Sequence, residues 1–166
     1  VMVGDGSYLM LNSEIATSVM LGLKLIIVVL DNRGFGCIQR LQLASGSPRF
    51  NNLLEDCVGD EGEDVKIDFA AHAASLGAEA QHVASVADLK AALQRARAAT
   101  RTQVIVIDTS PWRSTDDGGA WWEVAIPEVS ARDEVRRARA QYEQGVQDRA
   151  AAKGHDTAAR STEVGQ

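Results

Sequence analysis

The chain has 166 residues and a formal net charge of −6, from 17 lysines and arginines against 23 aspartates and glutamates. A chain of this length can bury a hydrophobic core, and one domain is the default. Nucleic-acid-binding proteins need clustered lysine and arginine, so the acidic balance argues against such a partner. No apolar run is long enough for a membrane span, no signal peptide is visible, and two cysteines make no disulfide framework. These features predict a soluble cytoplasmic protein without a membrane partner.

The first elements in chain order are a strand, a helix and a second strand. Residues 1–3 and 25–30 are short apolar runs typical of buried strands. Three apolar residues recur between them at helical spacing: Leu11, Ile15 and Val19. Asn12 and Ser13 are placed to cap the start of that helix. Such a crossover makes the two strands parallel, and parallel strands share the carboxyl-terminal edge at which open α/β sheets bind ligands.

Polar loops follow both strands. The first loop reads GDGS and contains Asp5, and the second reads DNRG and contains Asn32 and Gly34. Magnesium takes oxygen ligands in an octahedron, usually one or two carboxylates with phosphate oxygens and water. Asp5 supplies a charged oxygen, Asn32 an amide oxygen, and Gly34 a carbonyl that no side chain obstructs. One such loop alone is typical of a tight turn, whereas two at equivalent strand ends predict a magnesium site.

The small residues around Asp5 predict an anion site beside the metal. Gly4, Gly6 and Ser7 open a helix amino terminus, where free backbone N–H groups favour an anion such as a diphosphate. The alternative is a tight turn with an N-capping aspartate.

The chain then continues as alternating helices and strands. Helices are predicted over residues 37–43, 68–76 and 128–149, strands over 78–83 and 104–107, and a helix with a buried stripe of Val86, Leu89, Leu93 and Ala96. Residues 44–64 form an irregular excursion. Its acidic residues are Glu55, Asp56, Asp60, Glu61, Glu63 and Asp64. They lack the spacing of a calcium loop, which favours a solvated segment.

Two further groups of residues are predicted to be structural. An apolar patch is expected to pack against another domain or a partner subunit, and it consists of Trp121, Trp122, Val124 and Ile126. The three histidines, His72, His82 and His155, show no metal-ligand spacing.

The two loops resemble the fingerprint of thiamine diphosphate-dependent enzymes, usually written GDG…NN. Two longer stretches, LNSEIATSVMLGLKLIIVVLDNRGFGCIQRLQ and WWEVAIPEVSARDEV, resemble the C-terminal part of the 3D-(3,5/4)-trihydroxycyclohexane-1,2-dione hydrolase family of myo-inositol breakdown. The resemblance covers roughly residues 1–142. Asp31 departs from the pattern, which usually has asparagine there. The asparagine that binds the metal in the pattern is present as Asn32.

The resemblance implies an α/β fold, a doubly wound parallel-sheet diphosphate-binding domain. That domain would cover residues 1–149 and be incomplete at its N-terminal side. Residues 150–166 are small, polar and uncapped, and this composition predicts a disordered tail. The implied cofactors are thiamine diphosphate and Mg²⁺. The implied cofactor-binding residues are Gly4, Asp5, Gly6, Ser7, Asn32 and Gly34, of which Asp5, Asn32 and Gly34 bind the metal. Residues just beyond the metal loop line the pocket of the family, and here they are Cys37, Ile38 and Gln39.

The implied reaction is hydrolysis of a C–C bond that opens a cyclic polyol-dione to a 5-deoxy sugar acid. The activating glutamate of the family lies in a pyrimidine-binding domain and acts across a dimer interface. No residue here matches that motif, and Glu14 is not given that role. The chain is therefore expected to be a fragment that anchors the cofactor, is inactive alone, and works with missing domains in a homodimer or homotetramer.

Two alternatives stay open. The first is another enzyme of the same superfamily, such as an acetohydroxyacid synthase, a carboligase or a 2-keto acid decarboxylase. The second is a non-catalytic, metal-binding α/β module. The Asn32-Arg33-Gly34 loop argues against the non-catalytic module, because a turn at Asp5 with a purely structural role would need no second polar loop at this separation.

Overall fold

The computed structural model describes residues 1–57, 66–113 and 126–163, with side chains described through residue 151. The chain divides into two compact units. Unit 1 comprises Val1–Gln39 and Phe50–Ser114, and unit 2 comprises Arg40–Arg49 and Thr115–Gln166. Both predicted metal loops lie in unit 1.

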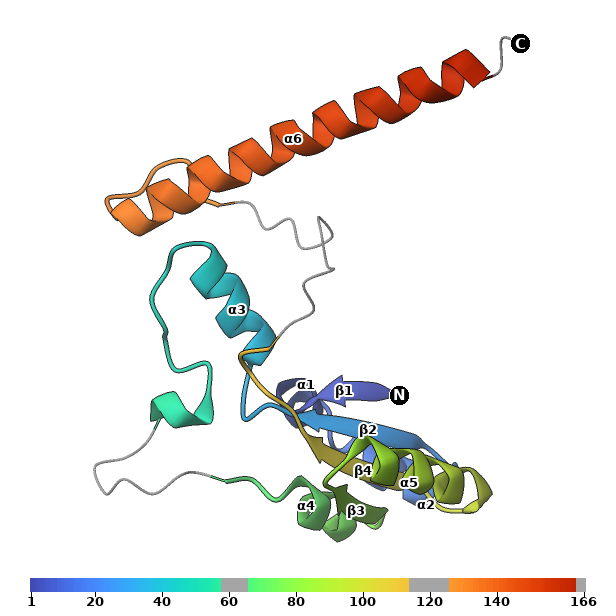
Figure 1. Ribbon diagram of the computed structural model, residues 1–166. Helices are drawn as coiled ribbons and strands as arrows, with labels where there is room; N and C mark the ends of the chain where they lie inside the picture. The colour runs from blue at the N-terminus through green and yellow to red at the C-terminus, as the bar shows by residue number, and fades with distance from the viewer. Residues whose placement is uncertain (58–65, 114–125, 164–166) are drawn as a thin grey trace. The chain divides into compact units, whose positions relative to one another are not determined.

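Unit 1 is built on one parallel sheet of four strands in the order β1-β2-β4-β3 (Figure 1). The strands are β1 (Met2–Gly4), β2 (Ile26–Asp31), β3 (Glu79–Val83) and β4 (Gln103–Asp108). Gly4 aligns with Leu30 across β1 and β2, and Asp31 aligns with Asp108 across β2 and β4. The loops that follow these three strands therefore leave from one edge of the sheet. The predicted pairing of the first two strands in parallel is confirmed.

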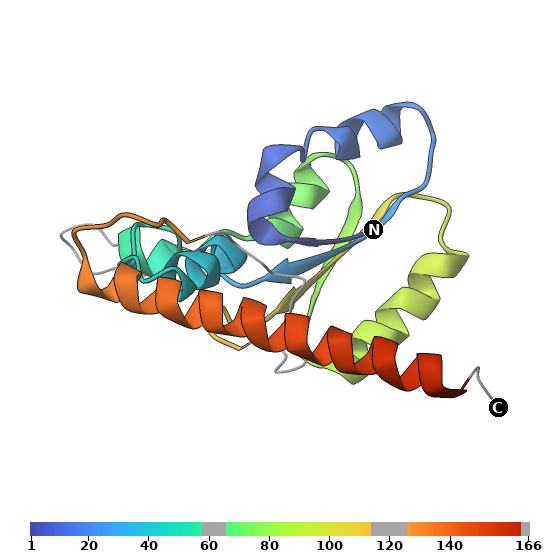
Figure 2. The same ribbon diagram turned by 90° about the horizontal axis from the view of Figure 1, so that it is seen from above.

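Helices cover both faces of this sheet, as the view from above shows (Figure 2). The helices of unit 1 are α1 (Asp5–Met10), α2 (Glu14–Met20), α4 (Phe69–Ser75) and α5 (Val86–Ala98), and a 3-10 turn spans Leu54–Cys57. Helix α3 (Gly36–Ala44) follows the second polar loop. Helices α1, α2 and α4 share one core cluster, and α5 contributes to the other.

The side chains of β4 alternate between the two core clusters. Val104 and Val106 pack with α1, α2 and α4, whereas Ile105 and Ile107 pack with α5. All four side chains are buried. A parallel strand buried on both faces is typical of doubly wound α/β sheets, so the predicted fold class is confirmed.

The segment between β1 and β2 differs from the prediction, because it forms two helices rather than one. Leu11 lies between them and is 67% exposed, whereas Ile15 in α2 is 2% exposed. Ser13 precedes α2 without a side-chain capping hydrogen bond, and Asn12 donates to the carbonyl of Leu9 instead. One apolar residue per turn fits one long helix or two short ones, so the spacing could not reveal the break.

In α5 the predicted stripe is confirmed at Leu89, Leu93 and Ala96, which pack in one core cluster, but not at Val86. Val86 is 64% exposed at the first helical position, whereas Ala92 is fully buried beside Ala96. The small side chain of alanine gives a weak hydrophobic signal, which is why the sequence pattern missed Ala92.

At α4 the predicted boundaries hold, because Asp68 caps the helix by accepting from the N–H of Ala71 at 2.8 Å.

The buried side chain of Thr102, just before β4, forms hydrogen bonds with the turn that precedes β2. Its hydroxyl donates to the carbonyl of Leu23 and accepts from the N–H of Leu25, each at 3.1 Å, and lies 2.8 Å from the hydroxyl of Ser18. Thr102→Val keeps the shape of the side chain but leaves buried polar groups without partners. We expect the free energy of unfolding of the 166-residue chain to fall by about 1–3 kcal/mol, measured by urea denaturation.

The matched control is Thr17→Val, which makes the same chemical change at an exposed position. We expect it to change stability by less than about 0.5 kcal/mol. Equal effects of the two substitutions would contradict the assigned role of Thr102.

Unit 2 contains the long helix α6 (Asp133–Glu163) and a small apolar cluster. Ile126, Val135 and Ala138 form this cluster. The cluster includes one residue of the patch predicted from the sequence. Its other members, Trp121, Trp122 and Val124, lie outside the described residues.

Helix α6 extends over most of the segment for which the sequence predicts a disordered tail, residues 150–166. That segment begins with the alanines at positions 150–152, and alanine has the highest helix propensity. Residues 164–166 lie outside the described part of the chain. Among the described residues, no helix combines the length and the apolar character that crossing a membrane requires.

Candidate functional site

Asp5 stands where β1 ends and α1 begins, and it joins the two polar loops. Its side chain is 1% exposed. Oδ2 accepts a hydrogen bond from the N–H of Gly34 at 2.6 Å, and Oδ1 accepts from the N–H of Asn32 at 3.4 Å. The structure thus brings together the three residues that the sequence predicts as metal ligands.

The side-chain amide of Asn32 points at two oxygens of the same site. One terminal atom of this amide lies 3.1 Å from Asp5 Oδ1 and 2.8 Å from the carbonyl oxygen of Gly34. With Nδ2 in that position, the amide donates a hydrogen bond to each oxygen. With Oδ1 there, the amide oxygen would face two other oxygens without a proton between them, so the first orientation is favoured in the absence of a cation.

The types of donor gathered here suit magnesium. The separations of 2.8 and 3.1 Å are those of hydrogen bonds donated by the Asn32 amide, so the donor types and not the spacing indicate the ion. One carboxylate, one amide and one backbone carbonyl also leave corners free for phosphate oxygens and water.

Two glycines give the second loop the shape that this arrangement needs. Gly34 has a φ of +138°, and a Cβ there would clash with the carbonyl oxygen of Asn52. At Gly36 a Cβ would lie 2.9 Å from atoms of the Asn32 amide. Neither position has room for a side chain. Glycine at both positions therefore allows the backbone to pass close to Asn52 and to the Asn32 side chain.

The residues predicted to hold a diphosphate surround Asp5. Gly4 is the last residue of β1 and precedes α1 in an extended conformation. Gly6 is buried and Ser7 is exposed, both in the first turn of α1. Backbone N–H groups in the first turn of a helix have no intrahelical acceptor. They can therefore donate to an anion that shares the metal site.

Burial raises the pKa of the Asp5 carboxyl above its ordinary value. The N–H groups of Gly34 and Asn32 oppose this shift by donating to the carboxylate, and the nearby charge of Asp31 adds to it. Because a buried charge is costly without a partner, a cation beside Asp5 would offset the cost of keeping it ionised.

The raised pKa predicts a pH dependence of metal affinity. Below this pKa Asp5 is protonated, and as a predicted metal ligand it would have to lose the proton before binding Mg²⁺. The Mg²⁺ affinity of the full-length protein is therefore expected to be highest above the raised pKa. As the pH falls through this pKa the affinity should decrease, and the decrease should begin at a higher pH than for a solvent-exposed carboxylate. Calorimetric Mg²⁺ titrations from about pH 8 to about pH 4 would measure this. An affinity that stays constant until the ordinary aspartate range would contradict it.

Helix α3 carries the three residues predicted to line a substrate pocket, in three different environments. Ile38 is 49% exposed and Cys37 is partly buried. Gln39 is fully buried, and its Oε1 accepts from Nδ2 of Asn52 at 3.0 Å. Cys37 and Ile38 are therefore accessible to a ligand, while the side chain of Gln39 faces the protein interior.

The sequence analysis missed the segment that packs on the second loop. Gly34 forms an isolated antiparallel bridge with Leu53, which is 1% exposed. The N–H of Phe35 donates to the carbonyl of Asn52 at 2.7 Å, and the N–H of Leu54 to the carbonyl of Arg33 at 2.8 Å. No local pattern signals such a pairing, because it joins residues about twenty positions apart within an irregular stretch.

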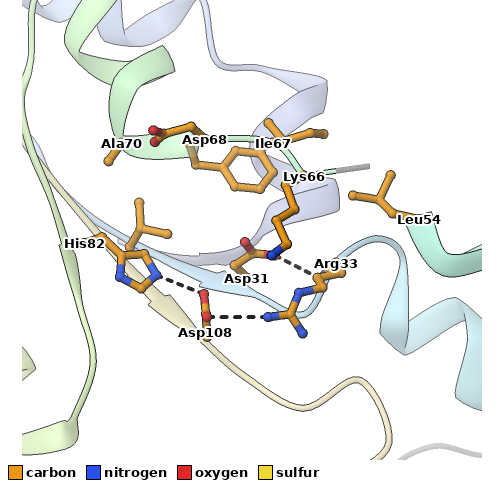
Figure 3. A pocket seen from close by; sticks show the side chains of 11 residues that line it. Asp31, Arg33, Leu54, Lys66, Ile67, Asp68, Ala70, His82 and Asp108 are labelled. Carbon is orange, nitrogen blue, oxygen red and sulfur yellow. Dashed lines mark hydrogen bonds and ion pairs between the residues drawn. The ribbon is translucent and has the colours of Figure 1, made fainter. Parts of the chain in front are cut away.

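A cavity of ≈ 420 Å³ opens beside the second loop and is lined by the ends of β2, β3 and β4 (Figure 3). Asp108 contacts two side chains at its rim, because its carboxylate oxygens lie 3.5 Å from Arg33 and 2.9 Å from Nε2 of His82. Arg33 has a φ of 62°, and its N–H donates to Asp31 Oδ1 at 2.9 Å. Asp31, which departs from the superfamily pattern, thus supports the turn at Arg33.

The remaining titratable residues form no further metal site in the described ranges 1–57, 66–113 and 126–163. No group of three or more histidine, cysteine, aspartate and glutamate side chains gathers there. His72 Nδ1 lies 2.8 Å from the hydroxyl of Tyr8, and the side chain of His155 lies outside the described residues. The same holds for four acids of the predicted solvated segment, Asp60, Glu61, Glu63 and Asp64.

Comparison with known families and curated proteins gives a consistent result. Residues 1–108 match the family described as thiamine pyrophosphate enzyme, C-terminal TPP binding domain. A 3D-(3,5/4)-trihydroxycyclohexane-1,2-dione hydrolase from Bacillus thuringiensis (strain Al Hakam) is 40% identical over 141 residues, and one from Bacillus cereus (strain AH820) is 39% identical. Each match covers 82% of this chain and 22% of the relative, so the chain spans about a fifth of the length of these proteins.

Solved structures share the fold. A thiamine diphosphate-dependent 4-hydroxybenzoylformate decarboxylase from Rhodococcus jostii RHA1 superimposes with a TM-score of 0.56 at 21% identity. Benzoylformate decarboxylase from Polynucleobacter necessarius gives a TM-score of 0.56 at 24% identity. Each match covers 66% of this chain and 19% of the other. At these identities the likeness establishes the fold alone.

Proposed function

This chain belongs to the thiamine pyrophosphate (thiamine diphosphate) enzymes, and on this premise we propose that it anchors the diphosphate of the cofactor through a magnesium ion. One observation carries the proposal. The Asn32 amide, a carboxylate oxygen of Asp5 and the carbonyl oxygen of Gly34 lie 2.8 and 3.1 Å apart. An amide, a carboxylate and a backbone carbonyl from two loops thus meet at one point, and these are donor types that Mg²⁺ prefers.

Each residue of the two loops has a defined role in this proposal. Asp5, Asn32 and Gly34 bind the metal, and Asp5 supplies the only carboxylate. The backbone N–H groups of Gly6 and Ser7 donate to the diphosphate, and Gly4 leaves room for it to approach. When bound, thiamine diphosphate supplies a carbon nucleophile and an electron sink. The role of this chain is to hold that cofactor in place.

We propose that the full-length protein hydrolyses a C–C bond and opens the ring of a 3D-trihydroxycyclohexane-1,2-dione. The resemblance to relatives named for this activity, at 40% identity over 141 residues, supports this reaction over others in the superfamily. In this proposal the substrate approaches α3 at the partly buried Cys37 and the exposed Ile38. The protein would work as a homodimer or homotetramer in the cytoplasm, with the activating glutamate supplied by a domain that this chain does not contain.

The second candidate is a decarboxylase, synthase or carboligase of the same superfamily. The solved structures with the same fold include two decarboxylases, at 21% and 24% identity. The cofactor site is common to both candidates, so it favours neither. A non-catalytic metal-binding module is disfavoured, because relatives with closely similar sequences are named as enzymes.

Cofactor binding by the full-length protein tests the anchor. Calorimetric titration with thiamine diphosphate should show saturable binding with Mg²⁺, and chelation of the metal should weaken it by at least about tenfold. Binding that is equally tight in EDTA would refute the role of the metal. Absence of binding in both conditions would refute the proposed function.

A further inference from the structure

Residues 52–54, which we call the backing segment, pair with the backbone of the second polar loop. Two backbone hydrogen bonds of 2.7 and 2.8 Å flank Gly34, and they join Phe35 to Asn52 and Leu54 to Arg33. Gly34 itself pairs with Leu53. The loop is thus held from two sides, because Asp5 Oδ2 accepts from the N–H of Gly34 at 2.6 Å.

The orientation of the Gly34 carbonyl depends on this backing segment. The φ of Gly34 is +138°, and its Cα lies so close to the carbonyl oxygen of Asn52 that a Cβ could not fit between them. A shift of the backing segment would therefore free the peptide of Gly34 to rotate. Rotation would turn a proposed metal ligand away from Asp5 and Asn32.

One buried side-chain contact ties the backing segment to α3. Gln39 is 0% exposed and its Oε1 accepts from Nδ2 of Asn52 at 3.0 Å. Nε2 of Gln39 is buried and has no hydrogen-bond partner among the described residues. A buried amide with an unsatisfied donor is destabilising, so a glutamine here is not explained by stability alone.

We propose that Gln39 and Asn52 are positioning residues of the metal site. They hold the backing segment against the loop and so fix the carbonyl of Gly34 without touching the ion. This inference rests on the proposed function, in which that carbonyl binds Mg²⁺. It assigns Gln39 a role behind the site rather than in the substrate pocket.

Two substitutions test the proposal in the full-length protein. Gln39→Met keeps the length of the side chain and removes its hydrogen bonding, and Asn52→Ala removes the partner from a half-buried position. We expect each to weaken Mg²⁺-dependent binding of thiamine diphosphate by about tenfold, the effect typical of residues that orient metal ligands. The cofactor affinity of the double variant should equal that of the single variant with the lower affinity, because both changes break the same contact.

Gln81→Met is the matched control. Gln81 is a half-buried glutamine on β3, and its Oε1 accepts from Arg95 at 2.8 Å. The Gln81→Met variant therefore loses a comparable side-chain hydrogen bond, at a position distant in sequence from the two polar loops. Its cofactor affinity should stay within about twofold of the natural protein.

Amide hydrogen exchange in the metal-free protein gives a readout that does not depend on the cofactor. The N–H groups of Gly34 and Phe35 should exchange faster in Gln39→Met and Asn52→Ala than in Gln81→Met. If the natural protein binds the cofactor and both variants bind equally well, the positioning role is refuted and the proposed function stands. Faster exchange with unchanged affinity would also refute it. If the natural protein itself shows no Mg²⁺-dependent binding, the proposed function fails.

Discussion

Asp5→Ala is expected to weaken Mg²⁺-dependent binding of thiamine diphosphate to the full-length protein by tenfold or more, about 1.4 kcal/mol for each factor of ten. Asp5 supplies the only carboxylate among the three proposed ligands, and a hard cation depends on that charge. Its carboxylate also accepts from the N–H of Gly34 at 2.6 Å, so its loss loosens the second loop. Calorimetric titration at fixed Mg²⁺ measures the change.

Two variants frame this measurement. Asn32→Ala removes the amide ligand and is also expected to lower the affinity by at least about tenfold. Glu14→Ala removes one negative charge from an exposed position at the start of α2 and should leave the affinity unchanged. Unchanged affinity in Asp5→Ala would refute the assignment of the anchor. A loss of equal size in Glu14→Ala would show that net charge alone governs binding.

Substrate choice should show an equally large effect. The full-length protein is expected to consume the cyclic trihydroxy-dione with one water and to release no carbon dioxide, at a kcat/KM at least about tenfold above that for pyruvate or glyoxylate. A hydrolase must admit water to a hydroxylated ring, whereas a decarboxylase must hold a carboxylate and expel carbon dioxide. Coupled assays on the three compounds measure the preference. Preferred turnover of pyruvate with release of carbon dioxide would place the protein in the synthase and decarboxylase branch.

The parts of the fold that follow from local sequence patterns were predictable. Strands β2 and β4 each contain a short apolar run bounded by polar residues, and such a run is typical of a strand buried in a parallel sheet. The polar loops after β1 and β2 could be placed together because a crossover fixes the direction of the strands it joins. That geometry brought Asp5 and Asn32 to one site although they are 27 positions apart.

Features that depend on contacts between distant, irregular segments could not be predicted. The break between α1 and α2 at Leu11 leaves no mark in the apolar spacing. The pairing of Gly34 with Leu53 has no sequence signature, and neither has the contact of the buried Gln39 with Asn52. The family resemblance therefore places Gln39 in a substrate pocket, while the structure gives its side chain a hydrogen-bond partner, Asn52, at 3.0 Å.

The pairing of the second loop with the backing segment has a consequence for protein engineering. Active-site grafting between related enzymes usually exchanges a short contiguous stretch, such as the loop and the first turn of α3. Here Gly34, Gln39 and Asn52 interlock through backbone and side chain, so a graft that stops before residue 52 would combine surfaces that do not match. Chimeras that exchange this loop should therefore place their junctions outside residues 32–54 and keep an aspartate at position 5.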